Sequence, residues 1–196
     1  MGILAALMQT AFLLYFSAPL AESLHDKLAT AEEEEATAYW AMSLAAALYG
    51  AAAGVIFGLV AERIEPAIAA LLFIGYSALP TLKWLPTPHG VSYLEPVWWR
   101  EAVYGLFLLY NMAAVLFSFI LIRRGVLRAA VAVVALAAGF FLFPGFTLPE
   151  KYASVVPELK ALQGLALASW ALFWAVMAVG GRLVMPIRRV QRGASP

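Results

Sequence analysis

Six stretches of this sequence are long and apolar enough to cross a lipid bilayer as helices, and this repetition limits the folds open to the chain. The hydrocarbon layer is about 30 Å thick and a helix rises about 1.5 Å per residue, so one crossing needs roughly 20 apolar residues. Hydrophobic residues make up 64% of the 196 residues and charged ones 13%, more apolar surface than a soluble core of this size buries. We predict an all-α membrane protein, a single transmembrane domain over residues 1–196, with spans at 2–20, 37–60, 66–85, 101–122, 126–144 and 161–184.

The basic residues between these spans indicate an orientation. Lys and Arg in short loops are retained preferentially on the cytoplasmic side of a membrane. With the N-terminus inside, eight of the 13 Lys and Arg residues are cytoplasmic, and ten of the 12 acidic residues face outward. Short inner turns also favour antiparallel neighbours. We therefore expect an up-and-down bundle of six helices in the plasma membrane, with both termini cytoplasmic and a basic cytoplasmic tail over residues 185–196.

Small residues recur in the second predicted span. Gly50, Gly54 and Gly58 are each four positions apart, so they share one helical face on which another backbone can approach closely. The pattern predicts tight helix packing. The partner is either another helix of this chain or a second subunit.

The first predicted outer loop begins with side chains that suit a divalent metal ion. If the first helix continues beyond the membrane, Glu22, His25 and Asp26 lie at positions i, i+3 and i+4 on one face. Imidazole and carboxylate groups bind ions such as Co(II), Ni(II) or Zn(II). His89, the only other histidine, follows the third span and could complete the site. The alternative interpretation is a solvated acidic helix end and a surface histidine.

The sequence carries no pattern typical of an enzyme. It has no Gly-rich phosphate loop, Ser-centred elbow or HExxH motif. None of the predicted spans has an ionisable residue near its centre, where such groups mark ion and proton pathways. Asn111, the only asparagine, is predicted to form a hydrogen bond between helices, with substrate contact as the alternative. We therefore expect that the protein is neither an enzyme nor a self-contained ion pump. We expect it to lie in the lipid bilayer and to have no nucleic-acid partner.

A run of prolines and aromatic residues joins the third and fourth predicted spans, and its prolines are predicted to end the third helix. The run comprises Pro80, Lys83, Trp84, Pro86, Pro88, Gly90 and Val91, and it continues into the fourth span with Glu95, Arg100 and Tyr104. The second span ends in Phe57, Gly58 and Leu59. Over residues 36–124 this pattern resembles the predicted cobalt transporter subunit family CbtA.

The resemblance implies a membrane component for cobalt uptake linked to cobalamin supply. It also implies a small single-span partner, CbtB, whose His-rich segment would supply metal ligands that this chain lacks. It assigns no role to the matching positions, which are Lys83, Trp84, Pro86, Pro88, Gly90, Glu95 and Arg100. The alternative function is a structural or accessory subunit of a larger membrane complex, for instance a respiratory one, for which smooth glycine faces and uncharged spans are expected.

Overall fold

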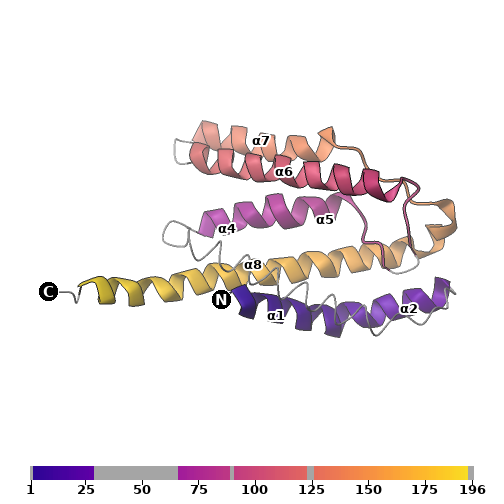
Figure 1. Cartoon of the computed structure of the whole chain (residues 1–196), viewed down its shortest axis with the longest axis horizontal. Helices are drawn as coiled ribbons and strands as arrows, with labels where there is room; N and C mark the ends of the chain where they lie inside the picture. Colours follow the sequence, from indigo (N-terminus) through magenta and orange to yellow (C-terminus); the bar gives the residue numbers. More distant parts are fainter. Residues whose placement is uncertain (1, 29–65, 89–90, 123–125, 194–196) are drawn as a thin grey trace.

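The computed structural model describes residues 2–28, 66–88, 91–122 and 126–193 (Figure 1). All the regular secondary structure among these residues is helical, and no strand occurs among them. The predicted second span at 37–60, with Gly50, Gly54 and Gly58, lies outside the described residues. The all-α prediction is confirmed for the part of the chain that is described.

Two long helices are each built from three segments. The first comprises α1 (Gly2–Phe12), the π-helical segment η1 (Leu13–Ser17) and α2 (Ala18–Leu28), and the second comprises α4 (Pro66–Leu72), the π-helical segment η3 (Phe73–Ala78) and α5 (Leu79–Lys83). The remaining elements are α6 (Val97–Ile122), α7 (Val126–Leu142), the 3-10 helix η4 (Glu150–Val155) and α8 (Val156–Gly193). From α4 onward, consecutive long helices run antiparallel (Figure 1).

Within the described residues, three helices are long and apolar enough to cross a membrane. They cover Gly2–Leu24, Val97–Ser118 and Glu150–Val179, and a shorter apolar helix covers Ala69–Lys83. The first helix extends beyond its predicted end at residue 20, and the last begins before residue 161. Both extensions are held by tertiary contacts, since Lys27 on α2 forms an ion pair with Glu158 on α8.

In each of these two three-segment helices, a π-helical segment precedes an internal proline. Proline lacks an N–H and its ring collides with the carbonyl four residues earlier, which normally breaks a helix. Here η1 precedes Pro19 and η3 precedes Pro80, and the wider π turn accommodates the altered hydrogen bonding. The third helix therefore passes through Pro80, the first proline of the run predicted to end it. The helix continues to Lys83 and ends at Trp84, where the backbone becomes extended ahead of Pro86.

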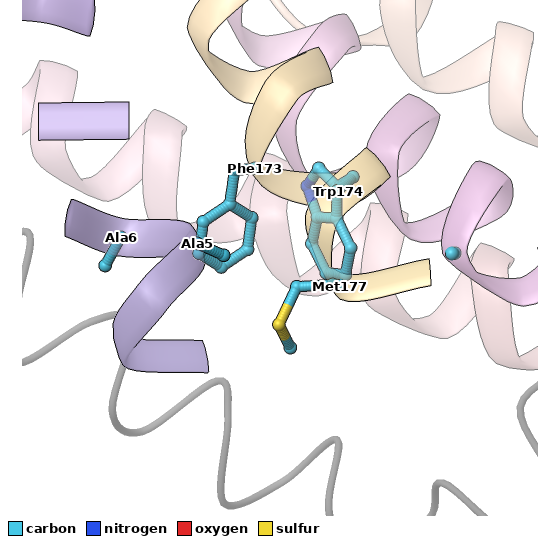
Figure 2. Close-up of a cluster of buried hydrophobic side chains, with 6 residues drawn as sticks. Ala5, Ala6, Phe173, Trp174 and Met177 are labelled. Carbon is cyan, nitrogen blue, oxygen red and sulfur yellow. The ribbon is translucent and has the colours of Figure 1, made fainter. Parts of the chain in front are cut away.

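Helix α8 lies between the α1–α2 helix and the α4–α5 helix, and the α6–α7 hairpin packs on the far side of α4–α5 (Figure 1). Between α1 and α8, the side chain of Phe173 points toward Ala5 and Ala6 (Figure 2). Trp174 and Met177 belong to the same buried cluster, together with Ala69 of α4. Two small alanines on α1 thus let the aromatic side chains of α8 approach its backbone.

Neutral polar side chains connect the helices inside the bundle. Trp174 Nε1 donates a hydrogen bond to Ser77 Oγ at 2.8 Å, joining α8 to η3. Gln9 Nε2 donates to Ser169 Oγ at 3.5 Å, joining α1 to α8. These side chains are buried, as expected for polar groups that must be satisfied within the bundle.

Asn111 departs from this pattern. Its side chain is fully buried, and neither its amide nitrogen nor its amide oxygen has a hydrogen-bond partner among the described residues. The predicted hydrogen bond between helices is therefore not found within this part of the chain. The amide oxygen lies over Gly139 of α7, only 3.3 Å from the position that a β-carbon would take there.

Asn111→Leu should stabilise the protein. A buried polar group without a partner costs about 1–3 kcal/mol, and leucine has a similar shape. We expect the free energy of unfolding to rise by about 1 kcal/mol, measured by SDS titration in detergent micelles. Ser118→Ala is the control, because Ser118 Oγ already donates to Ala114 O at 2.6 Å and its removal should bring no gain. A clear loss of stability in Asn111→Leu would contradict the interpretation.

Candidate functional site

The loops that carry most of the sequence-predicted site residues gather at one end of the bundle, which we call the loop end. It consists of the 84–96 connection, the 143–149 connection, η4 and the last turn of α2 (Figure 1). Two candidate sites lie here. One is the predicted metal site and the other is a cavity that the sequence did not predict.

The predicted metal site is partly visible. Helix α2 is continuous to Leu28, so the expected i, i+3, i+4 spacing of Glu22, His25 and Asp26 is present in the backbone. The Glu22 side chain is exposed. The side chains of His25 and Asp26, and the whole of His89, lie outside what the structure describes. Within the described residues, no group of three or more His, Cys, Asp or Glu residues could hold a metal ion.

Neighbours of the two histidines nevertheless lie in one buried cluster. Leu24, adjacent to His25, is completely buried, and Val91, two residues after His89, is 7% exposed. Both belong to a cluster that also contains Tyr152, Val155, Leu159 and Leu162. The end of α2 and the 84–96 connection are therefore packed together at the loop end, a proximity that the sequence could not reveal.

Aromatic rings fix the start of the 84–96 connection. Trp84 is only 7% exposed. Its ring stacks on Phe146 at a centroid distance of 5.0 Å and lies edge-on to Phe107 at 4.9 Å. Lys83 Nζ donates to the Phe140 carbonyl oxygen at 2.5 Å and lies 4.9 Å from the centroid of the Phe140 ring. The Lys83 ammonium is thus engaged with α7.

Backbone hydrogen bonds tie the two connections to each other. Leu94 N donates to Thr147 O at 3.0 Å, and Thr147 N donates to both carboxylate oxygens of Glu95 at 2.9 and 3.1 Å. Desolvation acts to raise the pKa of the Glu95 carboxyl, but the hydrogen bonds from backbone and Thr147 and the nearby charge of Arg100 together hold that pKa below its usual value. Glu95 is thereby kept as a carboxylate that braces the loops.

Two further side chains secure the connection, and sequence reasoning missed both. Gln163 on α8 donates from Nε2 to the carbonyl oxygens of Thr81 at 2.7 Å, Leu82 at 3.3 Å and Trp84 at 3.4 Å, where α5 leaves its last carbonyls unpaired. Tyr93 Oη donates to Leu85 O at 2.7 Å, and desolvation of the hydroxyl raises the pKa of Tyr93. The only signal for Gln163 in the sequence is an isolated amide in an apolar span.

A cavity of about 480 Å³ opens beside these aromatic rings. Its walls combine aromatic and apolar groups with one cation and one carboxylate, and they are formed by Pro80, Thr81, Trp84, Leu85, Pro86, Thr87, Tyr93, Val97, Arg100, Glu101, Tyr104, Phe146 and Ala166. Five of these positions, Pro80, Trp84, Pro86, Arg100 and Tyr104, are ones on which the family resemblance rests. These five positions, which lie between residues 80 and 104 of the sequence, therefore line one cavity.

Comparison of the chain with protein-family models, curated proteins and solved structures finds no match. Function must therefore be argued from the two candidate sites themselves.

Proposed function

We propose that this protein is a multi-pass plasma-membrane component of a divalent metal uptake system, with cobalt(II) as the substrate. In this proposal six spans place both termini in the cytoplasm, and Glu22, His25, Asp26 and His89 receive the ion at the outer face. The observation that supports it is that Leu24 and Val91, each within two residues of a histidine in the sequence, belong to the same buried cluster.

The chemistry of these residues suits capture more than permanent binding. Two imidazoles and two carboxylates satisfy a borderline divalent ion, and exposed carboxylates such as Glu22 exchange readily with water. No catalytic group is needed for this role. A small single-span partner subunit with a His-rich segment, which the CbtA resemblance implies, would accept the ion from this site.

The proposal predicts loss of uptake when the four residues are replaced together. In cells that depend on this protein, the Glu22→Ala, His25→Ala, Asp26→Ala, His89→Ala variant should lose most of its saturable uptake of radioactive cobalt, because the ion has no ligand left at the outer face. The control is Glu150→Ala with Lys151→Ala, two exposed charges of η4 at the same end. Membrane levels of both variants are measured by immunoblot.

Unchanged uptake in the fourfold variant would refute the metal site. The function itself is tested separately by purification in mild detergent. A stable stoichiometric assembly with a large complex, without any cobalt-dependent phenotype on deletion, would favour the accessory-subunit alternative over transport.

A further inference from the structure

The cavity at the loop end lies at the depth of the lipid headgroups. The apolar stretch of α6 begins at Val97, which lines the cavity. Trp98 and Trp99 follow at once and are 68% and 43% exposed. Tryptophan side chains favour the boundary between hydrocarbon and water. The first turn of α6 therefore places the cavity where phospholipid headgroups lie.

Two charged residues line the cavity, the cation Arg100 and the carboxylate Glu101, and they are adjacent in the sequence. Arg100 forms no ion pair with any described residue, although its guanidinium lies 5.8 Å from the centroid of the Tyr93 ring. Glu101 is exposed. The other nearby charges are committed elsewhere, since Lys83 is bonded to Phe140 O and Glu95 to Thr147 N. Among the described residues, the cavity walls therefore hold one cation, Arg100, and one exposed carboxylate, Glu101, with no excess of either sign.

Two buried donors on residues that line the cavity have no acceptor in the part of the chain that the structure describes. Trp84 is 7% exposed, and its indole Nε1 is buried without a hydrogen-bond partner. The Nε of Arg100 is also buried and unpartnered. Buried N–H groups are almost always paired in folded proteins, so two orphans in one wall indicate a missing acceptor. Phosphate oxygens are the acceptors that arginine pairs with best.

The aromatic walls suit the opposite charge. Trp84 lies 5.6 Å from Tyr104 and 5.0 Å from Phe146, measured between ring centroids, and Tyr93 lies 5.4 Å from Phe146. These rings line the cavity, and aromatic rings attract an ammonium group. Glu101 adds a carboxylate to the same walls.

We propose that this cavity binds the headgroup of a zwitterionic phospholipid. The phosphate pairs with Arg100 and the indole N–H of Trp84, the ammonium lies against the aromatic rings and Glu101, and the acyl chains run into the bilayer along α6. The cavity volume falls within the range of roughly 300–1,000 Å³ typical of small-molecule sites. This lipid site is separate from the proposed metal site and does not depend on it.

The test is retention of lipid by the purified full-length protein. Delipidated protein is mixed with dioleoyl phosphatidylethanolamine or dioleoyl phosphatidylglycerol, and bound lipid is counted by native mass spectrometry. We expect the ethanolamine lipid to be preferred. Arg100→Gln and Glu101→Gln should each weaken its binding about tenfold, as expected for loss of one charge-assisted hydrogen bond. Arg100→Lys, which keeps the charge, should weaken it less.

Matched controls come from η4, where Glu150→Gln and Lys151→Gln change exposed charges outside the cavity and should leave retention unchanged. Thermal melting in detergent verifies that each variant is folded. Stronger binding of the glycerol lipid in Glu101→Gln, without loss of the ethanolamine lipid, would overturn the proposal in favour of a plain anion site. Displacement of the lipid by millimolar inorganic phosphate or by phosphoethanolamine would instead identify a soluble ligand and overturn it as well. Equal retention in wild type and both cavity variants would also refute it.

Discussion

Phe173→Ala should lower the free energy of unfolding by about 3 kcal/mol, the largest loss that we expect from a single substitution. Phe173 is completely buried between α8 and α1, and its ring lies edge-on to Trp170 and Trp174 at 5.9 and 5.4 Å. Lipid is as apolar as a protein interior, so little of this loss reflects transfer from water. It reflects the packing contacts that the ring makes with Ala5 and Ala6 and that a cavity cannot replace (Figure 2).

The control for this prediction is Phe141→Ala on α7. Phe141 is 83% exposed and loses few protein contacts, so its removal should change the free energy of unfolding by less than about 0.5 kcal/mol. Both variants are compared by SDS titration in the same detergent. Similar losses in the two variants would show that Phe173 does not pack as described.

Gly139→Ala should separate α6 from α7 and lower the free energy of unfolding by about 1–3 kcal/mol. A β-carbon at this position would lie 2.5 and 2.7 Å from ring carbons of Tyr110, closer than van der Waals contact permits. The ring cannot easily turn away, because Tyr110 Oη donates a 2.7 Å hydrogen bond to Ala135 O on the same helix as the glycine. The added methyl group must therefore force the helices apart or break this bond.

Gly105→Ala is the matched comparison, since Gly105 lies on α6 of the same hairpin and no atom lies within 4 Å of its added β-carbon. Alanine favours a helix over glycine by about 1 kcal/mol, so this change should leave stability unchanged or raise it. SDS titration should therefore show opposite changes in the free energy of unfolding for the two variants, a decrease for Gly139→Ala and no change or an increase for Gly105→Ala. A neutral Gly139→Ala variant would contradict the close packing of α6 and α7.

The helical class and the approximate helix positions were predictable from the sequence because length and apolarity decide them. The ends of the helices were not. The first helix continues past its apolar stretch since Leu24 is buried and Lys27 reaches Glu158, 131 positions away in the chain. Local composition does not predict such long-range contacts. A stretch of charged and polar residues indicates only where the apolar segment ends.

The candidate sites, like the helices, were predictable from the sequence only in part. The spacing of Glu22, His25 and Asp26 on one face followed from helical periodicity, given that the first helix continues past residue 20. The position of Trp84 did not, because interfacial and buried tryptophans have the same sequence signature, and only Phe107 and Phe146 from distant helices and loops decide between them. For Asn111, a polar residue in a span indicated burial, which the structure shows, but the sequence does not reveal which helix faces the amide.

The π-helical segments before Pro19 and Pro80 have a geometric consequence for the loop end. Each wider turn acts like one extra residue in an α-helix, and one residue corresponds to a rotation of about 100° around the axis. Side chains beyond η1, Leu24 among them, therefore lie about a quarter turn from where a regular helical wheel drawn from Gly2 would place them. The burial of Leu24, and with it the direction in which Glu22 faces, depends on this offset. Deleting one residue within η1 would remove the wider turn and leave Leu24 and Glu22 on their present faces, whereas the same deletion between Ser17 and Glu22 would rotate both by about 100°.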